Sequence, residues 1–431
     1  MSRSPQQQLS PLEERFELWR RRLGLFAGPL AALVVYAGAG GLPEVERRLA
    51  AVLGLVIVFW VSEALPIPVT ALLGPALCVV VGVGEARTVF APFADPIIFL
   101  FLGSFLLARA MTVNGLDRRV ALGVLGSRLI AGSPARIRLA AGATALVLSM
   151  WLSNTASVAI LFPIIIGIGN ALERLFAEGN TQAARAGRRY LTGLMLMTAY
   201  AASVGGLATP VGSPPNLIGL GMLDNLAGVQ ITFFEWMVFA LPLSLVLFVV
   251  LAVVMRLLHP APAMRLEGLE PVLARLRAQV TPWGRAQTYT LAAFLTAVVL
   301  WVSPGLVALV RGAQDPLYRA LHGRVPEGIA ALLAASLLFL LPVEWKPPRG
   351  ALGWKEAVRI DWGTILLFGG GLTLGRQLYA TGLAERLAQG VLGTEGGASV
   401  WVITAVATLA ATVITETTSN TASASMLLPV V

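Results

Sequence analysis

The sequence has little of what many enzymes use for chemistry. Among 431 residues it contains one cysteine and two histidines, and only 13% of its residues are charged. A single cysteine, Cys78, excludes an intrachain disulfide and does not reveal the redox compartment. His259 and His322 are isolated at the ends of apolar segments, which argues against a histidine metal site. No small-residue cleavage site follows the first apolar segment, so we expect no removed signal peptide.

Apolar sequence is abundant. Hydrophobic residues make up 56% of the chain and form runs of about 20 residues, the length that spans a bilayer. These runs predict an all-α polytopic membrane protein. They centre near 25–41, 50–66, 69–84, 96–112, 190–222, 232–256, 287–310, 326–342 and 362–380, and two further apolar stretches occupy 139–170 and 399–431.

The chain contains an internal repeat with an offset of 266 positions. Its centre is a tripeptide: Ser153, Asn154 and Thr155 recur as Ser419, Asn420 and Thr421. The same offset relates Asp95 to Asp361, Gly103 to Gly369, Ser149 to Thr415, and Pro163 to Pro429. One constant offset over this much chain indicates two copies of a structural unit, and repeated units with polar centres are typical of transporters.

The net charge of +9 indicates membrane topology and not nucleic-acid binding. We assume a cytoplasmic N-terminus and treat the stretches at 139–170 and 399–431 as re-entrant hairpins. The cytoplasmic side then holds 23 of the 32 Lys and Arg residues, as the positive-inside rule expects. The segment that opens at Asp95 then runs inward and its partner at Asp361 runs outward, so we expect inverted-topology repeats. Both aspartates are expected to be N-caps.

Each tripeptide lies where a hairpin has to break its helix within the membrane, and unpaired backbone groups in hydrocarbon cost roughly several kcal/mol each. Ser, Asn and Thr oxygens can satisfy such groups and can also form an all-oxygen shell around Na⁺. The helix that leaves the break directs its positive N-terminal dipole at an anion beside the cation. A single copy is more simply a helix cap, but two copies in register favour a binding site. Neither hairpin tip contains Lys or Arg, so a bound anion depends on dipoles, hydroxyls and sodium.

A third polar constellation interrupts the apolar run at 190–222. It reads GGLATPVGSPPN from Gly205 to Asn216. Paired prolines and glycines cannot continue a regular helix, so we expect a broken membrane helix that lines a cavity.

Together these features divide the chain. We expect a cytoplasmic lead-in at 1–24, a first transmembrane helix at 25–48, repeat 1 at 49–258, a cytoplasmic linker at 259–286, and repeat 2 at 287–431. Repeat 1 contains the hairpin 139–170 and the broken helix 190–222, and repeat 2 contains the hairpin 399–431.

Four segments resemble the divalent anion/Na⁺ symporter (DASS) family, in particular its dicarboxylate-type members. These are SEALPIPVTALL at 62–73, the two tripeptides at 153–155 and 419–421, and GSPPN at 212–216. The resemblance covers nearly the whole chain. It implies a homodimer with a scaffold domain and an elevator-type transport domain, in the plasma membrane of the cell.

The resemblance also implies site residues. The first sodium site is expected at Ser149, Ser153, Asn154 and Gly212, and the second at Thr415, Thr418 (through its backbone) and Asn420. Substrate carboxylates are expected to contact Asn154, Thr155, Asn420 and Thr421. The repeat partner of GSPPN would lie near 478–482, past Val431, so we expect the second sodium site to be incomplete and the chain to be truncated.

The sequence therefore predicts a secondary transporter that takes up succinate, malate or fumarate with Na⁺. Nothing in the tripeptide measures the distance between two carboxylates, so a sulfate or other oxyanion carrier remains open, as does a sodium-independent dicarboxylate exchanger. A channel and an intramembrane hydrolase are disfavoured, and no histidine or acid pair accompanies Ser153. Glu63 and Glu416 are expected to form structural hydrogen bonds, Arg109 and Arg376 to snorkel or pair, and Gly369–Gly371 to permit close helix packing.

Overall fold

The protein is all-α. The structure, a computed structural model, describes residues 10–127, 133–177, 181–261, 282–346, 348–392 and 399–429, together with residues 274 and 278. Most of the expected linker at 259–286 lies outside these residues, as do residues 1–9 of the lead-in and the last two residues of the second hairpin. The one sheet in the described chain pairs β1 (Pro342–Trp345) with β2 (Pro348–Gly350) in antiparallel orientation. The predicted fold class is confirmed.

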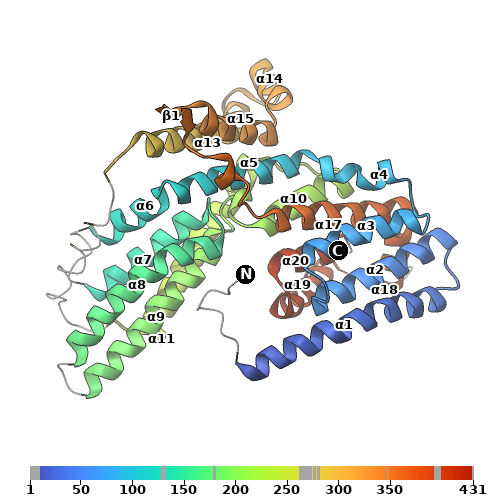
Figure 1. Ribbon diagram of the computed structural model, residues 1–431, viewed down its shortest axis with the longest axis horizontal. Helices are drawn as coiled ribbons and strands as arrows, with labels where there is room; N and C mark the ends of the chain where they lie inside the picture. The colour runs from blue at the N-terminus through green and yellow to red at the C-terminus, as the bar shows by residue number, and fades with distance from the viewer. Residues whose placement is uncertain are drawn as a thin grey trace. The chain divides into compact units, whose positions relative to one another are not determined.

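The chain forms two compact units (Figure 1). Unit 1 comprises Met1–Ile98, Ile218–Gln230 and Asp361–Val431. Its described helices are α1 (Pro11–Gly38), α2 (Glu44–Ser62), α3 (Ile67–Val80), α4 (Ala86–Phe90), the 3-10 turn η1 (Ala91–Ala94), α17 (Trp362–Thr381), α18 (Leu383–Leu392), α19 (Val400–Thr417) and α20 (Asn420–Leu427). It also includes most of α10 (Pro214–Ala227).

Close helix contacts hold unit 1 together. Helix α1 lies along α2, and α17 packs on α3 (Figure 1). A methyl group on Gly370 would lie 2.2 Å from the carbonyl oxygen of Ala71, so α17 can approach α3 this closely only with a glycine there. The expected packing role of the glycine run at 369–371 is therefore confirmed. The apolar core of the unit includes Leu49, Val56, Trp60, Leu374 and Leu378.

Unit 2 comprises Phe99–Leu217 and Ile231–Ile360. Its helices are α5 (Pro96–Val113), α6 (Leu116–Leu125), α7 (Pro134–Ser149), α8 (Asn154–Ala177), α9 (Thr181–Gly205), the 3-10 turn η2 (Pro210–Gly212), α11 (Phe233–Leu258), α13 (Arg285–Arg311), α14 (Pro316–Arg324), α15 (Glu327–Leu340) and α16 (Trp354–Ala357). The first residues of α5 and most of α10 are assigned to unit 1.

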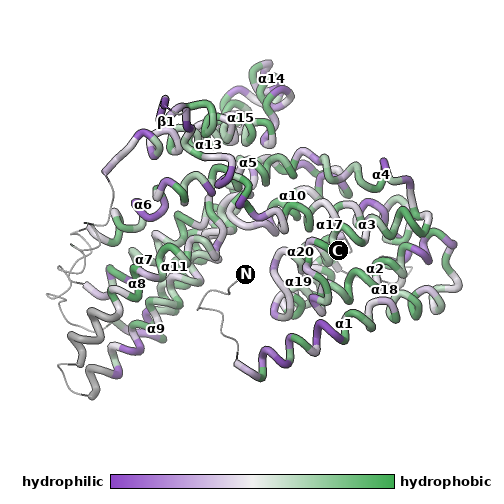
Figure 2. The backbone as a smooth tube through the Cα atoms, in the orientation of Figure 1, coloured by the Kyte–Doolittle hydropathy of each residue, from purple (hydrophilic) through white to green (hydrophobic). Residues whose placement is uncertain are grey.

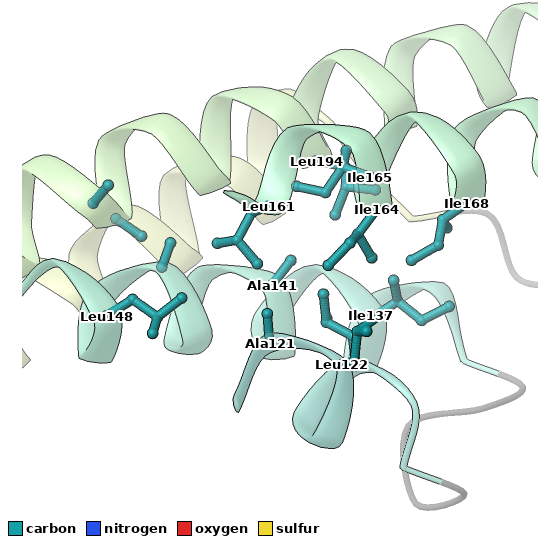
Figure 3. Close-up of a cluster of buried hydrophobic side chains, with 14 of the residues drawn as sticks. Ala121, Leu122, Ile137, Ala141, Leu148, Leu161, Ile164, Ile165, Ile168 and Leu194 are labelled. Atoms are coloured by element: carbon teal, nitrogen blue, oxygen red, sulfur yellow. The ribbon is translucent and has the colours of Figure 1, made fainter. Parts of the chain in front are cut away.

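The core of unit 2 lies among α7, α8 and α9, which run side by side (Figure 1). Figure 3 shows Leu161 and Ile165 of α8 beside Ala141 of α7 and Leu194 of α9. All four side chains are buried. Lipid is as apolar as these side chains, so close packing, and not removal from water, holds α7, α8 and α9 together.

Three described helices are long and apolar enough to cross a membrane: α5, α11 and α13. Helices α14 and α15 would form a fourth span, bent by 68°, if they act as one. Only 11% of the most apolar window of α11 is buried within the protein, which leaves an apolar surface suited to lipid. Figure 2 shows that hydrophobic residues dominate α13 and α15, whereas the hydrophilic residues of α1 gather toward its N-terminal half.

The helices repeat with the offset of the sequence. Helices α5, α7 and α8 begin at Pro96, Pro134 and Asn154, and α17, α19 and α20 begin 266 residues later. The predicted caps are present. An Asp95 oxygen accepts from the Ile97 amide at 3.1 Å, and an Asp361 oxygen accepts from the Thr364 amide at 3.1 Å.

The first helix begins earlier than its apolar run. Ser10 and Glu13 form a capping box, in which the Ser10 amide donates to the Glu13 carboxylate at 2.7 Å. Helix α1 therefore starts at Pro11, inside the expected lead-in, and ends at Gly38. Helix α2 starts at Glu44, whereas the first transmembrane helix was expected to extend to residue 48.

Candidate functional site

The tip of the first hairpin (residues 149–155, the first tip) joins the end of α7 to the start of α8. The hydroxyl of Ser149 donates to the side-chain oxygen of Asn154 at 2.7 Å. Ser149 is fully buried. The hydroxyl of Ser153 accepts from the Ala156 amide at 3.2 Å and so caps α8. The first tip thus holds a hydroxyl and an amide oxygen together at the beginning of a helix.

The broken helix meets the first tip at its glycines. Helix α9 ends at Gly205 and α10 begins at Pro214, so the predicted break is present. A methyl group on Gly206 would lie 2.3 Å from the side-chain oxygen of Asn154. One on Gly212 would lie 2.8 Å from the Gly206 carbonyl oxygen and 2.9 Å from that of Ser149. Only glycine allows the break to approach the first tip this closely.

Two side chains that sequence reasoning left without a role hold the break in place. Thr209 is fully buried, and its hydroxyl donates to the Met150 carbonyl and accepts from the Gly212 amide at 3.1 Å. The Asn216 amide donates to the carbonyls of Gly206 at 2.8 Å and Thr209 at 3.0 Å. Both are polar residues within an apolar run, which is the signal that could have singled them out.

The resulting cluster is neutral and rich in oxygen. It contains the Ser149 hydroxyl, the Asn154 side-chain oxygen, and backbone carbonyls of Ser149 and Gly206. Such a donor set suits a hard monovalent cation such as Na⁺ and lacks the thiolate or imidazole ligands that transition metals prefer. Helices α8 and α10 both begin here, so their positive N-terminal ends favour an anion nearby.

The tip of the second hairpin (residues 415–421, the second tip) repeats this arrangement within unit 1. The hydroxyl of Thr415 donates to the side-chain oxygen of Asn420, as Ser149 does to Asn154. Ser419 caps α20 by accepting from the Ala422 amide at 3.2 Å. Thr418 has an extended backbone, with φ −135° and ψ 177°, and its hydroxyl lies 2.7 Å from that of Ser423.

The structure therefore brings together some of the expected site residues within each unit. Ser149, Asn154 and Gly212 meet in unit 2, whereas Ser153 uses its hydroxyl as a cap and Thr155 is exposed. Thr415 and Asn420 meet in unit 1, and Thr418 follows the end of α19 directly. The expected substrate contacts at Asn154, Thr155, Asn420 and Thr421 stay a prediction.

Unit 1 also contains a charged junction that joins Asp95, Asn225 and Arg376. The sequence predicted a cap at Asp95 and a pair or snorkelling for Arg376, but it did not predict that they meet. Buried Asp95 accepts from the Asn225 amide at 2.9 Å and lies 3.6 Å from the Arg376 guanidinium, which also donates to the Asn225 oxygen. The junction connects the start of α5 and the end of α10 to α17. Arg376 thus forms a pair, one of the two outcomes expected for it.

Of the remaining polar candidates, Glu63 and Arg109 have partners in the described chain, and Glu416 has none there. Glu63 pairs with Arg20 and Arg21 at 3.3 and 3.4 Å, whereas Glu416 is exposed. The Arg109 guanidinium donates to the Glu356 carbonyl at 3.3 Å. Among the described residues, no group of three or more His, Cys, Asp or Glu side chains could hold a metal ion.

Comparison with known proteins adds to this geometry. The family profile described as the sodium:sulfate symporter transmembrane region matches residues 17–431. The sodium-dependent dicarboxylate transporter SdcS of Staphylococcus saprophyticus is 33% identical over 374 residues, covering 86% of this chain and 70% of the relative. SdcS of Staphylococcus aureus strain USA300 is 30% identical over 412 residues, covering 95% and 77%. An uncharacterized transporter of Haemophilus influenzae is 32% identical over 389 residues, covering 88% and 75%.

Proposed function

Because this chain belongs to the sodium:sulfate symporter family, we propose that it couples inward movement of Na⁺ to uptake of small dicarboxylates such as succinate, malate or fumarate. It is a multi-pass membrane transporter and not an enzyme. Relatives named as sodium-dependent dicarboxylate transporters support the choice of substrate and ion. The observation that carries the proposal is the hydroxyl-to-asparagine pair that recurs at both tips.

Sodium and the dicarboxylate are both cargo in this mechanism. At the first tip, Na⁺ would take the side-chain oxygens of Ser149 and Asn154 and the Gly212 carbonyl. The Ser149 hydroxyl donates its proton to the Asn154 side-chain oxygen, so binding one cation at both oxygens would require that hydroxyl to rotate. The amide nitrogen of Asn154 stays free to donate to a carboxylate, which makes substrate binding depend on the ion beside it.

At the second tip, Thr415, the Thr418 backbone and Asn420 would surround a second Na⁺. Thr155 and Thr421 would donate their hydroxyls to substrate. Alternating access by an elevator-type movement, a homodimeric assembly, and a plasma-membrane location with a cytoplasmic N-terminus complete the proposal. An inverted topology of the two repeats would give two conformations that exchange roles.

Uptake into proteoliposomes tests the proposal. We expect labelled succinate to accumulate with an inward sodium gradient and not when choline replaces sodium. Asn154→Ala is expected to remove this uptake, because it deletes both the cation ligand and the amide donor. Accumulation that does not depend on sodium but requires dicarboxylate inside the vesicles would show that the protein is an exchanger and not a symporter. Stronger competition by sulfate than by malate would show that its substrate is an oxyanion such as sulfate.

A further inference from the structure

In the break at residues 205–214, the backbone amides of Gly206, Leu207 and Ala208 donate to carbonyls three or four residues earlier in the chain. None of these local bonds reaches the hairpin of α7 and α8, yet the break supplies one wall of the first tip's oxygen cluster. A flexible wall would let the distance between Gly212 and the pair of Ser149 and Asn154 vary. Cation affinity depends on that distance, because ligands have to reach the ion together. A fixed site therefore requires a contact that holds the break against the hairpin.

Thr209 makes this contact through its side-chain hydroxyl. Its hydroxyl donates to the carbonyl of Met150, the residue directly after Ser149. The same hydroxyl accepts from the Gly212 amide at 3.1 Å, and the Thr209 carbonyl accepts from that amide at 3.3 Å. One fully buried side chain therefore sets the position of Gly212 relative to the end of α7.

Asn216 closes the other side of the break. Its amide nitrogen donates to the carbonyls of Gly206 and Thr209 at 2.8 and 3.0 Å. The turn that contains Gly212 is thus held from the first turn of α10 as well as from the hairpin. Thr209 is the link that reaches the hairpin, and Asn216 keeps the turn around it closed.

We propose that Thr209 is a positioning residue of the sodium site at the first tip: it sets the geometry of the ligands and does not bind the ion. This inference rests on the proposed function. Its hydroxyl already donates to the Met150 carbonyl and accepts from the Gly212 amide. Removing the hydroxyl takes this donor from the Met150 carbonyl and removes the hydrogen bond that joins the turn to the hairpin. Residues that orient metal ligands typically change affinity by about 10- to 100-fold when they are replaced.

The test measures sodium affinity without relying on transport. The purified full-length protein is titrated with NaCl, with choline chloride keeping the ionic strength constant, and its melting temperature is recorded. A ligand that binds only the folded state stabilises it by RT ln(1 + c/Kd), where c is the free ligand concentration, so a weaker site needs more sodium for the same rise in melting temperature. Thr209→Val is expected to raise the sodium concentration that gives a fixed rise in melting temperature by at least about tenfold, and Thr209→Ser, which keeps the hydroxyl, to restore it.

A matched control separates positioning from general stability. Thr198 lies on α9, is also buried, and donates its hydroxyl to the Leu194 carbonyl within its own helix at 2.9 Å. Thr198→Val is expected to leave the sodium titration unchanged. If Thr209→Val does not fold, Thr209→Cys keeps a weak donor and is expected to shift the titration in the same direction by a smaller factor.

The outcomes distinguish this inference from the function on which it rests. If the wild type responds to sodium and Thr209→Val matches it, the positioning role is wrong and the symporter stands. An equal shift in Thr198→Val also overturns the positioning role. A wild type that neither gains stability from sodium nor needs it for uptake overturns both. In uptake assays, Thr209→Val should retain its maximal rate at saturating sodium.

Discussion

At the scale of single residues, the first tip depends on how closely Gly206 approaches Asn154. A methyl group there would lie 2.3 Å from the Asn154 side-chain oxygen, which is far inside contact distance. Gly206→Ala should therefore displace the asparagine and lower sodium-driven uptake at least about tenfold, since displaced ligands cost that much in metal affinity. The measurement is initial uptake rate against sodium concentration.

A glycine with open surroundings supplies the control for that substitution. Nothing lies within 4 Å of a methyl group placed on Gly167, in the middle of α8. Gly167→Ala should keep wild-type uptake and gain slightly in stability, because alanine favours helix. Normal sodium dependence in Gly206→Ala would show that Asn154 is not a ligand.

Asp117, in α6 and outside the candidate spans, is expected to make stability depend on pH. Burial raises the pKa of this carboxyl above its usual value of 3.8, although the Arg118 amide and nearby groups offset part of the effect. The folded protein therefore favours the protonated form, and stability falls as the pH rises through the raised pKa. Asp117→Asn should melt higher than wild type at neutral pH, and the difference should vanish below about pH 3.8.

A series of melting curves across this pH range checks the prediction for Asp117. The partly buried N-cap Asp315, which accepts from the Leu317 amide at 2.8 Å, supplies a comparison. Asp315→Asn should gain no stability at neutral pH, because asparagine caps about as well as aspartate. A loss of stability in Asp117→Asn at neutral pH would contradict the reasoning.

At the scale of helices and their junctions, Asp95 and Asp361 occupy equivalent repeat positions but have different partners. Both cap a helix, whereas only Asp95 also binds Asn225 and Arg376. Losing a cap costs about 1 kcal/mol. Losing charge-assisted hydrogen bonds costs about 1.5 kcal/mol more. Asp95→Ala should therefore unfold at a lower temperature than Asp361→Ala.

The double substitution identifies which bond matters at this junction. If the Arg376 pair supplies the extra stability of Asp95, Arg376→Gln should lower the melting temperature of wild type and have little effect in Asp95→Ala. Additive losses in the double variant would mean that Asp95 and Arg376 act independently.

The sequence predicted elements well where local chemistry decides them. Prolines and glycines marked the break at residues 205–214, and the aspartates marked two helix starts. The recurrence of Ser149 and Asn154 as Thr415 and Asn420 marked the two tips. The bond from Thr209 to Met150 could not be predicted, because it joins residues 59 positions apart that only the tertiary fold brings together. The start of α1 was missed because a polar capping box carries the helix beyond its apolar run.

At the scale of the whole molecule, the repeat and the compact units divide the chain differently. Unit 1 draws on both repeats, since it includes residues before Ile98 and residues after Asp361. The sequence could not predict this division, because an offset relates equivalent segments without saying which segments pack together. Each tip nevertheless keeps its own asparagine and hydroxyl within one unit, so each proposed sodium site can be tested separately.

The inverted topology of the repeats is open to a direct test, because the chain has one cysteine and it is buried. Ser133 and Ser399 precede α7 and α19 and are 266 residues apart. In a Cys78→Ala background, Ser133→Cys and Ser399→Cys place equivalent thiols at the entrances of the two hairpins. We expect a membrane-impermeant maleimide to label Ser399→Cys in intact cells, and to label Ser133→Cys only after permeabilisation. Labelling of both thiols from one side would mean that the repeats run in parallel, and the exchange of roles that supports alternating access would lose its basis.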